Sequence, residues 1–162
     1  MKGFLILIVS LSFALTAFGQ HPSREKIEYI IYGTYCGECV SHCAQLYKLD
    51  TNVLLFDTAF DYFKKFYSPD SDKRFGFDKQ PLSQKKYLKA KKIMDSIPEI
   101  LFESPNKRFG TPDEHDQCGI FLQIKTSDKL NTFYIDTNLS AIPIELRNYA
   151  TLIMEYCYKN SQ

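Results

Sequence analysis

Two stretches of the chain have the density of β-branched and aromatic residues that is typical of buried strands. The first is IEYIIY at residues 27–32, and we expect this strand to end at Gly33. The second is CGIFLQIKT at residues 118–126. Because successive side chains of a strand point to opposite faces, alternate residues here share one face: Cys118, Ile120, Leu122 and Ile124.

Short polar turns join apolar runs at two places, which predicts two antiparallel hairpins. The runs AQLYKL and VLLFDT are separated by residues 50–52, so we expect strands at residues 45–49 and 53–58. The strand at residues 118–126 is followed by a polar turn and by TFYIDT, residues 132–137. This second pair of runs predicts the second hairpin.

From Ser83 onward the apolar residues recur every three or four positions, the period of an amphipathic helix that Ser83 is expected to cap. The apolar stripe consists of Tyr87, Ala90, Met94, Ile97 and Leu101. The opposite face carries Lys85, Lys86, Lys89, Lys91 and Lys92. Because proline is not tolerated inside a helix, Pro98 is expected to begin a second short helix, with Ser96 as its cap and Glu99 in its first turn.

A last helix is predicted to open at Pro143, a favoured first position for proline. Its apolar face consists of Leu146, Tyr149, Ala150, Ile153 and Cys157. Residues 59–81 mix aromatic and charged residues and predict a short strand or helical turn followed by an exposed loop, and residues 103–117 predict a loop. The order of elements predicts an α+β fold: an antiparallel β-sheet built from hairpins, with two main helices packed on one face.

Residues 1–19 have the three parts of a secretory signal peptide. Lys2 gives a positive start, residues 4–18 are mostly apolar, and the small residues Ala17 and Gly19 precede the expected cleavage point. The apolar run is shorter than the roughly 20 residues that span a bilayer. We therefore expect export to the periplasm or the medium, with no stable membrane span after cleavage.

Cleavage after Gly19 would leave residues 20–162, a length that suits a single α+β domain with its own core. It would remove Lys2 and no acidic residue, so the 20 basic residues of the chain become 19, against 19 acidic ones. Nucleic-acid binders gain affinity by neutralising phosphates. The neutral balance therefore argues against a nucleic-acid partner, and the basic and aromatic residues between positions 64 and 75 are interpreted as a solvated loop.

All five cysteines lie beyond the expected leader: Cys36, Cys39, Cys43, Cys118 and Cys157. An exported chain meets an oxidising environment, which favours disulfides. The disulfide candidates are Cys36, Cys39, Cys43 and Cys118, with the pairing left open. Cys157, on the apolar face of the last helix, is the expected free and buried thiol.

One alternative for the segment CGECVSHC is redox catalysis. Cys36 and Cys39 form a C-x-x-C after a strand, as in a thioredoxin-like thiol–disulfide oxidoreductase. Such a site needs a long helix after the first cysteine, and residues 40–49 are short for that helix and run into a turn.

A second alternative is a metal centre. Cys36, Cys39 and Cys43, completed by His42 or His115, could surround zinc in a tetrahedron. An oxidising compartment works against thiolate ligands, so the sequence predicts neither a metal nor another cofactor.

Residues 32–58, YGTYCGECVSHCAQLYKLDTNVLLFDT, resemble the opening of a family of small exported bacterial domains of unknown function. That family carries a pattern like Gly-x-Cys-x-Gly-x-Cys-Pro-x-Tyr, followed by a strand, a tight turn and a second strand. Cys39, Cys43 and Tyr47 match its cysteine pair and tyrosine, while Ala44 replaces the proline and the middle glycine is missing. The later FGTPDEHDQCGIFLQI is similar to a loop and strand of small secreted relatives, so the resemblance covers about half of the mature chain. The resemblance implies an antiparallel sheet with packed helices. It does not suggest an activity, because the family's function is not established.

No pattern of a known reaction occurs in the chain, such as G-x-S-x-G, H-E-x-x-H or a phosphate-binding glycine loop. The sequence therefore predicts an exported domain with a structural or binding role and no catalytic residues. The ligand or partner is not specified by the sequence.

Overall fold

The structure is a computed structural model that describes residues 26–37, 39, 43–58, 75–104, 107–114 and 118–160. The expected leader, residues 1–19, lies outside the described residues, and so does most of the mixed segment at residues 59–81. None of the described helices is both long and apolar enough to cross a membrane.

Within the described residues, one sheet of six strands forms the middle of the molecule, in the order β3-β2-β1-β5-β6-β4. The strands are β1 Ile27–Cys36, β2 Ala44–Asp50, β3 Leu54–Phe56, β4 Arg108–Phe109, β5 Cys118–Thr126 and β6 Leu130–Asp136. Neighbouring strands are antiparallel except for β4, which runs parallel to β6. Both predicted hairpins, β2–β3 and β5–β6, are present.

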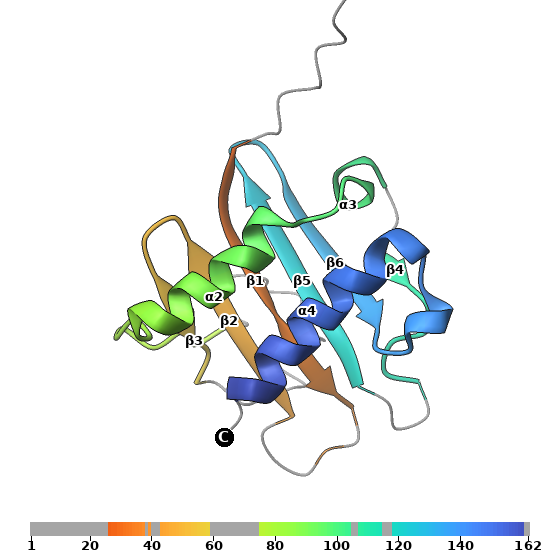
Figure 1. Cartoon of the computed structure of the whole chain (residues 1–162), viewed down its shortest axis with the longest axis horizontal. Coiled ribbons are helices and arrows are strands. Elements are labelled where there is room, and N and C mark those ends of the chain that lie inside the picture. Colours follow the sequence, from red (N-terminus) through yellow and green to blue (C-terminus); the bar gives the residue numbers. More distant parts are fainter. Residues whose placement is uncertain are drawn as a thin grey trace, which may run out of the picture.

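Two main helices cover one face of this sheet, as Figure 1 shows. They are α2 Gln84–Asp95 and α4 Ile144–Asn160, and shorter turns lie at α3 Ile100–Glu103 and η2 Leu139–Ala141. The predicted α+β architecture is confirmed, with a mostly antiparallel sheet and two main helices on one face.

The alternation of side chains along the strands separates two hydrophobic clusters. Ile30 and Tyr32 of β1 belong to the larger cluster, under the helices, together with Ile120, Leu122 and Ile124 of β5. Ile31 and Tyr35 of β1 point to the opposite face. The predicted apolar face of the last helix is buried in the larger cluster at every position: Leu146, Tyr149, Ala150, Ile153 and Cys157.

Two glycines allow β1 to sit closely between its neighbours. A Cβ at Gly33 would collide with the backbone carbonyl of Gln45 on β2. A Cβ at Gly119 of β5 would lie 2.6 Å from the ring of Tyr35, the residue directly opposite it on β1. The ring of Tyr35 therefore covers a position at which no other side chain fits.

Several predicted boundaries are wrong. Gly33 does not end the first strand, because β1 pairs with β2 and β5 on both sides and continues to Cys36. Ser96 ends α2 with its N–H bonded to Lys92 O, rather than capping the next helix, and Glu99 precedes α3.

Two further differences concern residues that the sequence pattern placed incorrectly. Ile93 is fully buried in α2, whereas the predicted stripe residue Met94 is only half-buried. The two-residue strand β4 lies inside the predicted loop at residues 103–117 and pairs with Tyr134 and Ile135 of β6.

Candidate functional site

Two disulfides lie at the end of the sheet where β1 finishes and β5 begins. Cys36 and Cys118 occupy directly opposite positions on these strands and are bonded, with their Cα atoms 4.1 Å apart. The Cys36 N–H donates to Cys43 O, on the β2 side. The pair with Cys118 is thus a non-hydrogen-bonded pair, in which antiparallel strands approach most closely.

The second disulfide joins Cys39 to Cys43, with the Cα atoms 5.3 Å apart. All four predicted disulfide candidates are therefore bonded, and Cys157 is the free, buried cysteine. This arrangement confirms the interpretation of the cysteine cluster as a covalent cross-link within the fold.

The disulfide connectivity argues against both alternatives for this cluster, a thioredoxin-like redox site and a zinc site. Cys36 and Cys39 are bonded to different partners, and only seven residues separate Cys36 from the start of β2, too few for a helix of three turns. Cys36, Cys39 and Cys43 have no thiolate to offer a metal while they are bonded, and His42 and His115 lie outside the described residues. The residues that the structure describes contain no group of three His, Cys, Asp or Glu that could hold a metal ion.

Hydrogen bonds fasten neighbouring loops to the disulfide end of the sheet. The Gly37 N–H donates to Asp113 Oδ1 at 2.5 Å, and Thr137 Oγ1 donates to Cys118 O at 2.8 Å. The buried Asp136 accepts from the N–H of Thr111 at 2.9 Å. Two disulfides and these hydrogen bonds therefore link the described loops to this end of the sheet.

Cys157 lies among buried tyrosines beneath α4, beside a cavity of about 430 Å³. The cavity is lined by Thr34, Gln45, Cys118, Thr137, Met154, Cys157 and Tyr158. Burial raises the pKa of the Cys157 thiol to about 12, and a hydrogen bond with Thr34 opposes part of that rise. Because the thiolate is the reactive form of cysteine, this thiol is a poor nucleophile at neutral pH.

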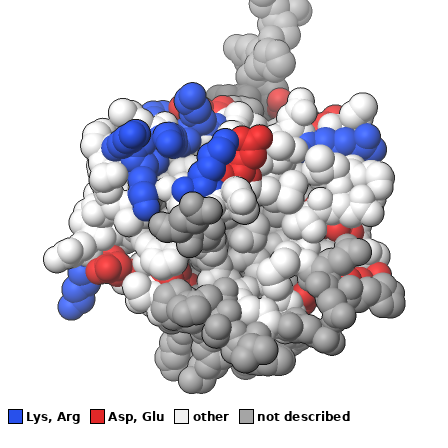
Figure 2. Space-filling view, turned by 60° about the horizontal axis from the view of Figure 1, so that its bottom comes forward, with Lys and Arg blue, Asp and Glu red and all other residues white. Residues whose placement is uncertain are grey.

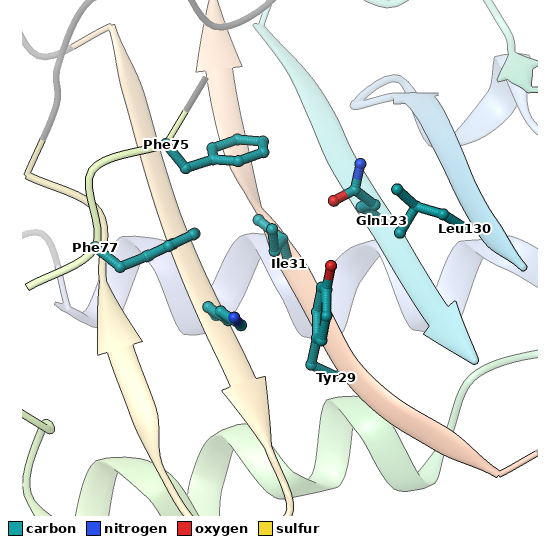
Figure 3. A pocket seen from close by; sticks show the side chains of 7 residues that line it. Tyr29, Ile31, Phe75, Phe77, Gln123 and Leu130 are labelled. Carbon is teal, nitrogen blue, oxygen red and sulfur yellow. The ribbon is translucent and has the colours of Figure 1, made fainter. Parts of the chain in front are cut away.

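A second cavity, of about 180 Å³, opens on the face of the sheet that points away from the helices. Its lining consists of Tyr29, Ile31, Lys48, Phe75, Phe77, Gln123 and Leu130 (Figure 3). Three aromatic rings, two aliphatic side chains, one amide and one ammonium group therefore surround the same small space. Small-molecule sites commonly combine aromatic and aliphatic side chains with a few convergent polar groups, as this lining does.

The sheet provides the floor of this cavity through its register. Ile31 of β1 lies directly opposite Lys48 of β2 on one side and Gln123 of β5 on the other. These three residues form one row across three strands, with the ammonium at one end and the amide at the other. Because neighbouring strands are about 4.8 Å apart, the Cα atoms of Lys48 and Gln123 are roughly 10 Å apart.

The segment at residues 75–78 provides the aromatic wall, because it is bonded to the edge of the sheet. The Gly76 N–H donates to Asp57 Oδ1 at 2.9 Å, and the Asp78 N–H donates to Phe56 O at 2.8 Å. Phe75 and Phe77 stack with ring centroids 5.5 Å apart. Phe75 also contacts Phe121 of β5, at 5.7 Å between ring centroids, so the wall rests on the sheet.

The polar groups of the cavity are held in place by specific contacts. Lys48 Nζ lies 4.4 Å from the centroid of the Tyr29 ring, a cation–π contact that holds the ammonium beside the cavity. Gln123 Nε2 donates to Thr132 Oγ1 at 3.1 Å, and the amide is buried. Among the described residues no acidic side chain lines the cavity, and Lys48 forms no ion pair with them. The described residues that line the cavity therefore carry one positive charge, that of Lys48.

The sequence patterns did not predict this site: they place Phe75 in a solvated loop and name no other lining residue as a candidate for binding. Lys48 and Gln123 are polar residues on the open face of two strands, which is where alternation places solvated side chains. The one available signal was Gln123 within the otherwise apolar run CGIFLQI, because a polar residue in a buried strand needs a partner.

A second surface with a strong charge lies on α2. Figure 2 shows a group of basic side chains at the upper left of the view. The rotation between Figures 1 and 2 brings α2 to this side. Lys85, Lys89 and Lys92 are exposed and form no ion pair with the described residues, whereas Lys91 binds Asp95 at 2.7 Å. These side chains form an exposed basic helix face that also carries the exposed Leu88.

Comparisons of this chain with models of protein families, with characterised proteins and with solved structures found no match.

Proposed function

We propose that this chain is an exported binding domain, stabilised by two disulfides, that takes a small molecule in the cavity on the open face of its sheet. The observation that carries the proposal is this cavity, in which rings from β1 and from residues 75–77 surround a floor of Ile31. The disulfide end of the sheet has a structural role in the proposal and takes no part in binding.

The proposal of export rests on the cysteines and on the N-terminal residues. Bonded cysteine pairs persist in oxidising compartments and are rare in the cytosol. Residues 1–19 have the pattern of a signal peptide, and the resemblance of residues 32–58 to an exported family agrees with it. The observed pairing of four cysteines supports an exported location for residues 20–162.

Export can be tested by expressing the full chain in a bacterial host and measuring the intact mass of the recovered protein. We expect a chain that begins at Gln20 and lacks the hydrogens lost in forming two disulfides. A chain recovered from the cytosol with residues 1–19 still attached and all cysteines reduced would contradict this part of the proposal.

The proposal of binding rests on the exposure of the apolar side chains around the cavity. Phe75, Phe77 and Tyr29 are only half-buried, and Leu130 at the cavity rim is 44% exposed. Exposed apolar surface that is contiguous and concave is a common mark of a binding site. A ligand would remove this surface from water at about 25 cal/mol per Å² of apolar area.

Binding can be tested with a library of small aromatic and aliphatic molecules, followed by amide chemical shifts in NMR spectra. We expect shifts to concentrate at β1, β2, β5 and residues 75–77. Leu130→Trp, at the rim, should abolish them, whereas Leu88→Trp, at a comparably exposed leucine of α2, should leave them unchanged. Shifts confined to other surfaces, or equal effects of the two variants, would show that the cavity is not the site.

A further inference from the structure

We infer that the ligand of the sheet-face cavity is a single aromatic ring that carries a carboxylate, with a hydrogen-bond donor on the opposite side of the ring. The inference rests on the proposed binding function and names the class of ligand. It follows from the volume of the cavity, from its walls and from the row of Lys48, Ile31 and Gln123 across the sheet.

The volume limits the ligand to about one ring. An apolar protein cavity of roughly 150 Å³ accommodates benzene. The sheet-face cavity measures about 180 Å³, which matches a ring with small substituents, whereas a fused ring system or a nucleotide would extend beyond it.

The walls favour a flat, aromatic body over a saturated one. The stacked rings of Phe75 and Phe77 lie on one side of Ile31, and Figure 3 shows Tyr29 on the other side. Aromatic pairs in stacked or edge-to-face geometry are more favourable than their buried area alone indicates. A planar ring above Ile31 can make such contacts with several of these side chains at once.

The charge of the described lining residues favours an anionic substituent on the ligand. Lys48 is the one charged residue among the described residues that line the cavity, and its ammonium is held over the Tyr29 ring at 4.4 Å. A carboxylate placed beside it gains a charge-assisted hydrogen bond. A cationic ligand would be repelled by Lys48, although the aromatic walls alone would suit a cation.

At the Gln123 end of the row, the ligand is expected to carry a hydrogen-bond donor. Gln123 Nε2 is engaged with Thr132, and Figure 3 shows the amide oxygen turned toward the side of Ile31. An amide oxygen accepts a hydrogen bond from an O–H or N–H group. Lys48 and Gln123 lie on opposite sides of Ile31, so the two substituents belong at opposite positions of the ring.

The inference can be tested by NMR titration of the oxidised full-length domain with four probes of one shape: 4-hydroxybenzoate, benzoate, 4-hydroxybenzamide and 4-hydroxybenzylamine. We expect 4-hydroxybenzoate to bind most tightly. Loss of the charge in 4-hydroxybenzamide should weaken binding about tenfold or more, as expected for a hydrogen bond to a charged group. Benzoate should bind less tightly than 4-hydroxybenzoate, and the benzylamine should bind least tightly.

Variants connect this preference to one side chain. Lys48→Met should remove the preference for the carboxylate while retaining weak binding of the neutral amide. Lys85→Met, which changes an exposed lysine of α2, should leave both affinities unchanged. If Lys48→Met fails to fold, the ranking of the four probes by the unmodified protein still decides the question.

The outcomes separate the two proposals. If the neutral amide binds as tightly as the carboxylate, or if Lys48→Met keeps the preference, the ligand class is wrong and the cavity still binds small molecules. If none of the four probes shifts any resonance of the cavity, and the wider library gives no shifts there either, the ligand class and the binding function both fail.

Discussion

At the scale of single residues, two buried tyrosines of the helices differ in the hydrogen bonding of their hydroxyl groups. Tyr87 donates a hydrogen bond from its hydroxyl to Thr51 O at 2.7 Å. The Tyr149 hydroxyl is buried and has no hydrogen-bond partner among the described residues, and burial raises its pKa. The sequence predicts both residues as members of an apolar stripe and does not distinguish them.

Replacing these two tyrosines by phenylalanine should therefore have opposite effects on stability. Tyr149→Phe removes a buried hydroxyl that is not bonded, so we expect the free energy of unfolding to stay equal or to rise by about 1 kcal/mol. Tyr87→Phe removes a hydrogen bond that the folded protein forms, so it should lower the free energy of unfolding by about 1 kcal/mol. Guanidinium unfolding of both variants measures the difference, and a clear loss of stability in Tyr149→Phe would contradict the structure of its surroundings.

At the scale of elements, the sequence predicts those whose period is strong and local. The pattern of α4 and the pattern of β5 each lie within a single continuous segment of the chain. Both elements occur where these patterns predict them. The sequence does not predict β4, because its two residues are ordered by pairing with β6 rather than by their own pattern. The extension of β1 past Gly33 likewise depends on strands far away in the chain.

The candidate site could not be predicted for the same reason. The row of Lys48, Ile31 and Gln123 exists only once β1 has paired with β2 and β5 in one register. A shift of one residue would turn these side chains to the other face. The sequence shows which cysteines are available for disulfides in an oxidising environment. It does not show their pairing, because Cys36 and Cys118 are brought together only by the folded sheet.

The two disulfides should contribute unequally to stability, because they close loops of different length. Cys36–Cys118 spans 82 positions and Cys39–Cys43 spans 4. Loop-closure entropy gives about 4.5 kcal/mol for the longer loop and about 2 kcal/mol for the shorter. We expect C36A/C118A to lose more stability than C39A/C43A in guanidinium unfolding without reductant, and the reverse order would contradict the entropic explanation.

At the scale of the whole molecule, the sheet separates two different environments. The side under the helices contains a cluster of tyrosines in which the rings of Tyr32, Tyr47 and Tyr156 lie 5.2–5.6 Å apart, next to Cys157. The opposite side contains the charged, partly open cavity. Burial is the main cause that raises the pKa of each member of the tyrosine cluster, and it raises that of Tyr156 to about 12.

This cluster should make the fold sensitive to alkaline pH. Cys157 keeps its proton in the folded state up to a pKa of about 12, whereas an ordinary thiol pKa is 9.0. Between these values the unfolded chain binds fewer protons than the folded one, so the free energy of unfolding falls as pH rises. Below about pH 9 this contribution is fully present.

The measurement is guanidinium unfolding at about pH 8 and about pH 11, for the unmodified protein and for Cys157→Ala. We expect a loss of stability at the higher pH that is smaller in Cys157→Ala, because the tyrosines still titrate in that variant. Equal stability of the unmodified protein at the two pH values would contradict the burial of this cluster.

The bond between Cys36 and Cys118 also determines how the molecule responds to force. If the chain is pulled by its two ends, tension passes from β1 through the disulfide directly into β5. Residues 37–117 form a closed covalent ring that carries no load until that bond breaks. The same ring tolerates cutting, since a protease that cleaves one peptide bond between positions 37 and 117 leaves both fragments joined. The paired strands β1 and β5, with β6 and α4 behind them in the sequence, would remain one molecule after such a cut.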